Sequence, residues 1–171
     1  MKNTVLTLLG ACLLSWGLPA SAQKPAPHLD NDMLKFFSGN WKGEGAFANG
    51  RPIAATLVFR PSLDSAWLVC EHRDVAPNRY KADLYWGVDG ATGKVVAYAF
   101  DNFHGHRMFN TDGWMDGNLV LQRQAEAPGV GVYYERFKYQ RLSDDSFRMA
   151  YSTSRDGVGW MTGDSLVFKR Q

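Results

Sequence analysis

The chain is poor in cysteine, has no excess of charge of one sign, and lacks an apolar run long enough to span a bilayer as a helix. Its 171 residues include only two cysteines, Cys12 and Cys70, which excludes a scaffold held by several disulfides. Lys and Arg number 19 against 17 Asp and Glu, and these charges are scattered. We therefore expect no binding to nucleic acid, because such a surface creates no long-range attractive field.

Several catalytic signatures are also missing. The sequence contains no Gly-x-Ser-x-Gly elbow, P-loop, dinucleotide-binding glycine fingerprint or His-Glu-x-x-His motif. No catalytic residue, metal ligand or cofactor is therefore assigned from motifs. Whether the protein is an enzyme stays open on the sequence, with the balance against it.

The first 22 residues have the three parts of a cleavable signal peptide. Lys2 supplies the basic start, residues 5–18 form a mostly apolar run without charge, and Ala20-Ser21-Ala22 fits a signal peptidase. This run is shorter than the ~20 residues of a permanent transmembrane helix. We expect a periplasmic or secreted protein whose mature chain begins near Gln23. Leu9-Gly10-Ala11-Cys12 also resembles a lipoprotein box, so lipid anchoring at Cys12 is the alternative, and the mass of the mature protein distinguishes the two.

Cleavage near Ala22 would leave Cys70 as the one cysteine of an exported chain. Cys70 lies between Val69 and Glu71 in a predicted strand, where a small buried apolar side chain is the expected role rather than a reactive thiol. Stability must then come from core burial, and aromatic residues, at 13% of the chain, can supply it.

The mature sequence changes from a short helical pattern to a long series of strand patterns. Residues 23–32 are rich in proline at their start and are expected to be loose. Asp30 or Asp32 can cap a short helix through Met33, Phe36 and Phe37 that ends at Gly39. Ten alternating or apolar runs follow, separated by turn residues such as Asn49-Gly50 and Asp116-Gly117. They are Trp41–Ala48, Ile53–Arg60, Ala66–Val75, Tyr80–Val88, Lys94–Asp101, Arg107–Trp114, Asn118–Gln124, Val132–Arg141, Ser146–Ser154 and Trp160–Lys169.

Short connections predict that strands adjacent in sequence pair antiparallel. The fold expected for residues 33–171 is all-β, an up-and-down antiparallel barrel of about ten strands with one short N-terminal helix, because closure removes exposed sheet edges. A β-sandwich is the alternative. A barrel of this size either fills its interior with side chains or retains room for one small ligand.

The most specific local pattern is Gly39-x-Trp41-x-Gly43-x-Gly45 at the start of the first strand. It resembles the first strand of calycin-type barrels, where the Trp plugs one end, and its fuller form is similar to that of nitrobindin-like haem-binding barrels. Leu84–Asp89 and Ser154–Trp160 resemble segments of a family of exported bacterial proteins of unknown function with lipocalin-like folds. This second resemblance covers most of residues 33–170 and implies a ten-strand barrel without an established activity.

The histidines argue against the haem implied by the nitrobindin-like resemblance. Such proteins ligate iron with a histidine near the C-terminus, and this chain has none after His106. Tyr151 is the remaining candidate ligand. His104 and His106 flank Gly105 after Asp101, a pattern that suits a turn better than a zinc site.

Five residues are the predicted ligand-binding set. Trp41, Trp86 and Tyr151 are expected to form pocket walls, and Glu71 and Arg136 to anchor a polar group. Glu71 alternates with Trp67 and Val69, a row taken to face inward, and a buried carboxylate needs a cation such as Arg136 or Arg148.

The first functional hypothesis is an exported barrel that binds a small, largely apolar molecule. The second is an enzyme on the same barrel, an isomerase, lyase or hydrolase of a small apolar substrate, with Glu71 or the His104/His106 pair as acid–base groups; haem-dependent chemistry is a further variant. A third is an envelope interaction module with an exposed apolar patch.

Overall fold

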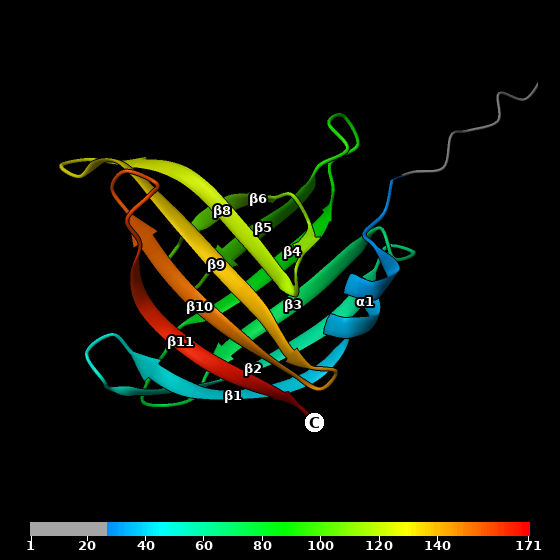
Figure 1. Cartoon of the computed structure of the whole chain (residues 1–171), viewed down its shortest axis with the longest axis horizontal. Helices are drawn as coiled ribbons and strands as arrows, with labels where there is room; N and C mark the ends of the chain where they lie inside the picture. Colours follow the sequence, from blue (N-terminus) through cyan, green and yellow to red (C-terminus); the bar gives the residue numbers. More distant parts are fainter. Residues whose placement is uncertain (1–26) are drawn as a thin grey trace, which may run out of the picture.

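Residues 27–171, described by a computed structural model, form a closed antiparallel barrel of ten strands with one additional short strand (Figure 1). The elements are α1 Asn31–Phe37, β1 Gly39–Phe47, β2 Pro52–Ser62, β3 Trp67–Asp74, β4 Lys81–Val88, β5 Val95–Asp101, β6 His106–Thr111, β7 Trp114–Met115, β8 Asn118–Ala127, β9 Gly131–Ser143, β10 Ser146–Ser154 and β11 Met161–Arg170. Strands adjacent in sequence pair antiparallel, except that β6 and β7 both pair with β8, and β1 also pairs with β11. The predicted up-and-down barrel is confirmed. The expected signal peptide and Cys12 lie outside the described residues.

The predicted strand Arg107–Trp114 is wrong as a single element. The chain turns at Asp112-Gly113, where Gly113 has a φ of +93°, a left-handed conformation that glycine adopts without steric cost. The strand therefore divides into β6 and the two-residue β7, which folds back onto β8. Closure of the ring falls to β6 and β8, which share the single bridge Asn110↔Gln122.

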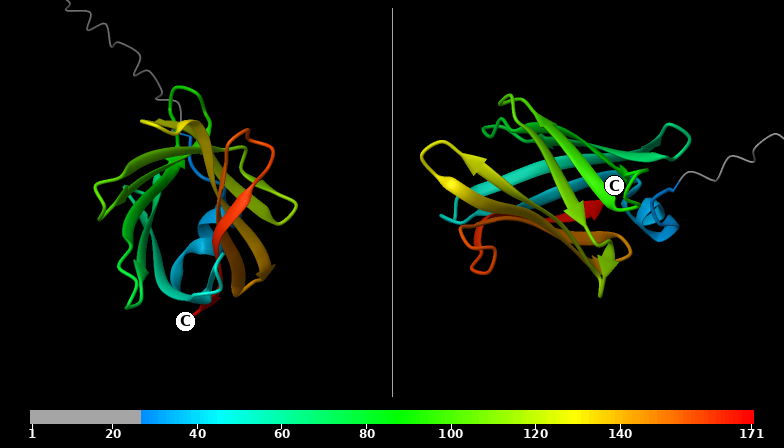
Figure 2. Two further views of the ribbon diagram at one scale, coloured as in Figure 1. Left: turned by 90° about the vertical axis from the view of Figure 1, so that its left-hand side faces the viewer. Right: turned by 90° about the horizontal axis from the view of Figure 1, so that it is seen from above.

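Helix α1 covers one end of the barrel (Figures 1 and 2). Asp30 caps it by accepting a hydrogen bond from the backbone N–H of Asp32 at 3.2 Å. At the other end, the Arg170 guanidinium donates to the carbonyl oxygens of Phe36 and Ser38, both at 2.7 Å. These bonds satisfy helix-end carbonyls and tie α1 to the last strand. Leu29, which precedes the helix, is completely buried.

The half of the barrel next to α1 has a dense aromatic core. Trp41 is 1% exposed, and its Nε1 donates to the carbonyl oxygen of Phe37 at 2.7 Å. The rings in edge or stacked contact around it and its neighbours are Phe36, Phe37, Phe59, Trp86, Trp114, Tyr139, Phe147 and Phe168. Trp41 therefore fills the covered end, as the Gly-x-Trp pattern predicts.

The glycines after Trp41 are explained by close approach. A Cβ added to Gly43 would lie about 2.5 Å from the Phe168 ring, and one added to Gly45 would lie 1.9 Å from the Ser165 carbonyl oxygen. Only a residue without a side chain lets β1 and β11 come this close. The Gly-x-Gly pattern thus belongs to barrel packing rather than to a ligand.

The opposite end of the barrel is bordered by hairpin loops and has no helix over it (Figure 2). The connections around this open end are residues 48–51, 75–80, 102–105, 128–130 and 155–160. Within residues 27–171, no helix combines the length and apolarity needed to cross a membrane.

Candidate functional site

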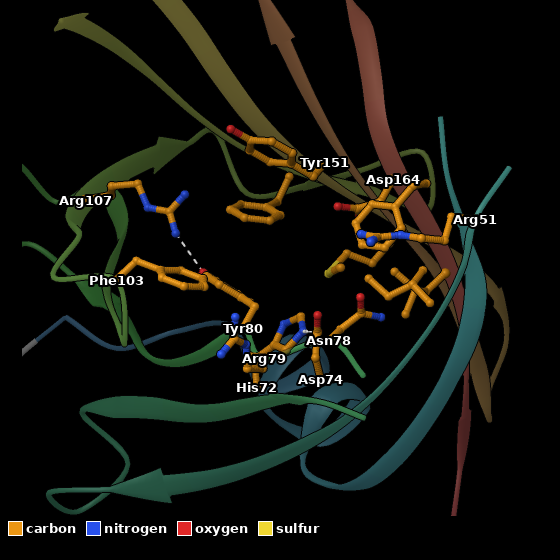
Figure 3. A pocket seen from close by; sticks show the side chains of 15 residues that line it. Arg51, His72, Asp74, Asn78, Arg79, Tyr80, Phe103, Arg107, Tyr151 and Asp164 are labelled. Atoms are coloured by element: carbon orange, nitrogen blue, oxygen red, sulfur yellow. Dashed lines mark hydrogen bonds and ion pairs between the residues drawn. The ribbon is translucent and has the colours of Figure 1, made fainter. Parts of the chain in front are cut away.

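A cavity of about 360 Å³ lies inside the open end of the barrel (Figure 3). Its apolar wall comes from the inward faces of five strands and comprises Phe47, Ile53, Phe137, Met149 and Leu166. Its polar lining comprises Arg51, His72, Asp74, Asn78, Arg79, Tyr80, Arg107, Tyr151 and Asp164, with Phe103 at the mouth. The volume lies in the range of small-molecule sites, and the mixture of an apolar wall with a few polar groups is typical of them.

His72 and Asp74 form a hydrogen-bonded pair in this cavity. Both lie on the inward face of β3, and His72 Nε2 is 2.9 Å from Asp74 Oδ1. Their side chains are only 9% and 4% exposed. A carboxylate accepts the hydrogen of the imidazole, so Nε2 carries the proton in the neutral ring and Nδ1 carries the lone pair. No hydrogen-bond partner of Nδ1 occurs within residues 27–171.

Asp164 faces the cavity from β11, on the side opposite His72 and Asp74 (Figure 3). Its Oδ1 is buried and has no hydrogen-bond partner among the described residues. Burial raises the pKa of this carboxyl group from its ordinary value of 3.8 to about 6; a positive charge on His72 lowers it and the charge of Asp74 raises it. Asp164 is consequently a carboxyl group that keeps its proton more readily than an exposed aspartate.

Tyr80, which immediately precedes β4, has a polarised hydroxyl. Arg107 Nη2 donates to the Tyr80 oxygen at 2.7 Å and also contacts Asp101 Oδ2 at 3.0 Å. The hydroxyl hydrogen of Tyr80 therefore remains free to donate. Burial raises the pKa of Tyr80 even though Arg107 lowers it, which keeps the phenol protonated.

A further buried carboxylate, Glu135 on β9, connects Arg107, Arg123 and Tyr151. Glu135 is only 5% exposed. Glu135 pairs with the Arg123 guanidinium, lies 3.7 Å from Arg107 and accepts a hydrogen bond from the Tyr151 hydroxyl at 2.7 Å. Burial and this hydrogen bond raise the pKa of Tyr151 well above its ordinary value. The Tyr151 proton is thus committed to Glu135.

The five predicted ligand-binding residues are not brought together. Tyr151 lines the cavity. Trp41 and Trp86 are in the aromatic core at the covered end, both 1% exposed and away from the cavity lining. Glu71 and Arg136 project from the outer surface of the barrel.

The predicted inward orientation of Glu71 is wrong. Leu68, Cys70 and His72 form the inward row of β3, whereas Glu71 pairs with Arg60 and lies 3.7 Å from Arg73 on the outside. The physical reason is that Trp67, in the same row as Glu71, packs over Gly87 on the outer surface.

The predicted cationic partners of Glu71, Arg136 and Arg148, are also wrong. Arg136 lies between inward-facing Glu135 and Phe137, with its guanidinium 4.0 Å from the centre of the Trp160 ring. Arg148 is exposed and bonds Gln140. Neither contacts Glu71, and the inward carboxylate that needs cations is Glu135.

The histidine cluster does not reach the interior. His104 is exposed in the loop after β5, with a φ of +64°, and His106 is exposed at the start of β6. Asp101 instead accepts hydrogen bonds from the backbone N–H groups of Phe103 and Gly105. These residues therefore shape the loop that carries Phe103, and both histidines point to water.

The cavity does not offer the haem ligand that the nitrobindin-like resemblance implies. The imidazole of the described lining belongs to His72 on β3, far from the C-terminal position of that ligand. The other candidate, the Tyr151 hydroxyl, donates its hydrogen to Glu135. Among residues 27–171 no group of three His, Cys, Asp or Glu side chains is arranged to hold a metal ion.

Sequence reasoning overlooked His72, Asp74 and Asp164 as one site. His72 and Asp74 share a strand face because side chains alternate along a strand, so this pair carried a detectable signal. Asp164 lies on the last strand, far along the chain, and only barrel closure brings it to the same cavity. Nothing in its local sequence indicates that it is desolvated.

No protein-family model matches the chain, and a search of curated proteins finds no match. Among solved structures, Rv2717c from M. tuberculosis is similar in fold, with 17% sequence identity and a TM-score of 0.52 over 84% of this chain and 99% of that one. Two redesigned β-barrels also match. One, mFAP1 bound to DFHBI, has 14% identity and a TM-score of 0.38 over 81% of this chain and 97% of that one. The other, b11L5F_LGL, has 12% identity and a TM-score of 0.36 over 81% and 94%. The similarity to Rv2717c shows the barrel fold.

Substitution Asp164→Asn is expected to change the pH dependence of stability. Because the folded pKa is raised, the folded state binds this proton more tightly than the unfolded chain, so its stabilising effect is present below about pH 4 and is lost as pH rises through 6. Relative to the wild type, Asp164→Asn should gain on the order of 1–3 kcal/mol between pH 4 and pH 7.5. Urea unfolding at both pH values measures this difference, and an equal effect of the substitution at both would contradict the raised pKa.

Proposed function

We propose that the protein is an exported barrel that binds one small, largely apolar molecule in the cavity at its open end. The observation that carries the proposal is the contrast between the two halves of the barrel. The half beneath α1 is filled by aromatic rings, whereas the other half retains about 360 Å³ of space behind an open mouth. A fold that needed only a core would gain stability by filling this space, because interiors are normally close-packed.

Chemistry of the lining supports a ligand that is apolar over most of its surface and polar at one part. Phe137, Met149 and Leu166 provide apolar contact deep in the cavity. His72, Tyr80 and Asp164 provide hydrogen-bonding groups at defined positions. Such a lining fixes the orientation of a ligand through few polar contacts and gains affinity from apolar burial.

Export and kinship are parts of the same proposal. The signal-like pattern in residues 1–22 supports a location in the periplasm or outside the cell. The Gly-x-Trp pattern at Gly39–Gly45 supports kinship with calycin-type barrels. The mature barrel would then meet its ligand outside the cytoplasm.

A neutral fluorescent dye, N-phenyl-1-naphthylamine, tests the binding site directly. Leu166 and Val167 are consecutive residues of β11 that face opposite sides of the barrel, with Leu166 in the cavity wall. Leu166→Trp should fill the cavity and weaken dye binding at least about tenfold, since it removes the apolar volume that the dye occupies. Fluorescence titration measures the affinity.

The matched control is Val167→Trp, which adds the same ring on the outer face and should leave dye affinity unchanged. Far-ultraviolet circular dichroism shows whether each variant retains the barrel. If the folded Leu166→Trp protein binds the dye as the wild type does, the cavity is not the binding site.

A further inference from the structure

We propose that the cavity is a proton-transfer site that isomerises a small unsaturated carbonyl compound, with His72 as the base, Tyr80 as the donor to the carbonyl oxygen, and Asp164 as the acid. This inference rests on the proposed function, because the substrate would occupy the same cavity. It adds a reaction to what would otherwise be a binding site.

The base is assigned from geometry. Asp74 Oδ1 lies 2.9 Å from His72 Nε2 and fixes the orientation and tautomer of the ring. The unprotonated Nδ1 then has no partner among the described residues, although the side chain is only 9% exposed. An oriented imidazole with a free lone pair in a mostly apolar cavity is the arrangement that general-base catalysis needs. Asp74 is a positioning residue in this scheme.

A donor for a carbonyl oxygen lies next to the base. The rings of His72 and Tyr80 are in edge contact, with centroids 5.3 Å apart. Arg107 donates to the Tyr80 oxygen at 2.7 Å, which leaves the Tyr80 hydrogen for the substrate and makes it a stronger donor. Arg107 itself is balanced by Asp101 and Glu135, so this cation is fixed in place before any substrate binds. Preorganised donors of this kind stabilise an enolate oxygen.

The acid lies on the other side of the cavity. Asp164 faces His72 and Asp74 across the space that a substrate would occupy (Figure 3). Its buried Oδ1 lacks a partner, and the same desolvation favours the protonated carboxyl group. A proton acceptor and a proton donor on opposite sides of one cavity are the arrangement that a proton shift within a bound substrate requires.

Acyl and imine chemistry lack their usual nucleophiles in this cavity. The described lining contains no serine, threonine, cysteine or lysine side chain. Cys70 is buried in the barrel wall and does not line the cavity, and burial raises the pKa of its thiol. A proton shift needs only a base, an acid and an oxygen donor, and it needs no co-reactant.

The proposed reaction balances within the substrate. His72 Nδ1 takes a proton from the carbon between the carbonyl group and the double bond, and the C–H electron pair forms a dienolate whose oxygen is held by the Tyr80 hydroxyl. Asp164 then gives its proton to the far carbon of the former double bond, and the electrons return to the carbonyl group. The product is the conjugated isomer. Transfer of the proton from His72 to Asp164 through water restores both groups.

The test uses cyclohex-3-en-1-one and a two-ring β,γ-unsaturated octalone with the protein in D₂O. Proton NMR follows exchange of the α-hydrogens, and ultraviolet absorbance follows formation of the conjugated ketone. The wild type should catalyse both for at least one ketone. His72→Gln should slow both by about 10²–10⁴-fold, and Tyr80→Phe by about 10²–10³-fold.

Asp164→Asn separates the two steps. Since His72 remains, α-hydrogen exchange should continue, whereas isomerisation should fall by at least about 10²-fold because the acid is gone. His106→Gln, which removes an exposed histidine outside the cavity, should leave both rates unchanged. The proposal is overturned if the wild type exchanges neither ketone, or if His72→Gln keeps full activity.

Dye binding distinguishes failure of the proposed isomerisation from failure of the proposed binding function. A wild-type protein that binds N-phenyl-1-naphthylamine in the cavity but exchanges neither ketone retains the binding site and refutes the chemistry. A protein that does not bind the dye and exchanges neither ketone refutes both.

Discussion

Trp41→Ala is expected to lower the free energy of unfolding by about 3–5 kcal/mol, the range for removal of a large buried aromatic side chain. Trp41 is 1% exposed, its ring centre is 4.8 Å from that of Phe147, and the Arg170 guanidinium lies 4.2 Å from its ring. Removing the ring leaves a void between α1 and β11. Domains of this size are stable by about 5–15 kcal/mol, so the loss is a large fraction. Urea unfolding at constant pH measures it.

Comparison with Trp86 separates the hydrogen bond from the packing. Trp41 Nε1 donates to the Phe37 carbonyl oxygen, whereas Trp86 Nε1 is buried without a partner in the described structure. Trp41→Phe should therefore cost more stability than Trp86→Phe, by about 1 kcal/mol. Because neither indole lines the cavity, both variants should bind N-phenyl-1-naphthylamine as the wild type does. Weaker dye binding by either folded variant would place that indole in the ligand site instead.

Strand positions were predictable because their signals are local. Alternation and turn residues such as Asn49-Gly50 and Asp116-Gly117 place the hairpins, and Gly50 and Gly117 have the positive φ values that such turns require. The predicted strand Arg107–Trp114 is wrong because the turn at Asp112-Gly113, which lies between apolar residues, divides it into β6 and β7. Closure into a barrel followed from the short connections.

The inward face of β3 was not predictable from its own sequence. Trp67 and Val69 compete with Leu68 and Cys70, so both rows begin with apolar side chains. The choice depends on a neighbour, since Gly87 on β4 leaves room for the Trp67 ring outside. Because the row of Trp67, Val69 and Glu71 was predicted to face inward, Glu71 was predicted to need a buried cationic partner.

The composition of the site reflects the same limit. Aromatic residues were sensible candidates for pocket walls, but Trp41 and Trp86 fill the covered end, and Tyr151 is the one of the three that faces the cavity. Which aromatic residues fill space and which border it is decided by the position of α1. The physical rule that a buried carboxylate needs cations holds in this protein for Glu135 rather than for Glu71.

Glu135→Gln is expected to lower the free energy of unfolding by about 3–5 kcal/mol, because it leaves the mostly buried Arg123 without a carboxylate partner and Arg107 with Asp101 alone. The carboxylate is shared by Arg107 and Arg123, whose side chains are 15% and 20% exposed, and it accepts the Tyr151 hydrogen bond. An amide has the same shape but no charge, and it accepts through only one oxygen. Urea unfolding at neutral pH measures the loss.

Glu71→Gln is the matched control. It makes the same chemical change at a carboxylate that also contacts two arginines, Arg60 and Arg73, but on the outer surface, where Arg60 is 59% exposed. Water screens such pairs, so the expected loss is about 0–1 kcal/mol. Added salt should weaken the small Glu71 contribution and leave most of the Glu135 contribution, since buried pairs are screened less. Equal losses of stability for the two variants would mean that Glu135 is as hydrated as Glu71. Glu135 could not then hold Arg107 against Tyr80 in a cavity that excludes water.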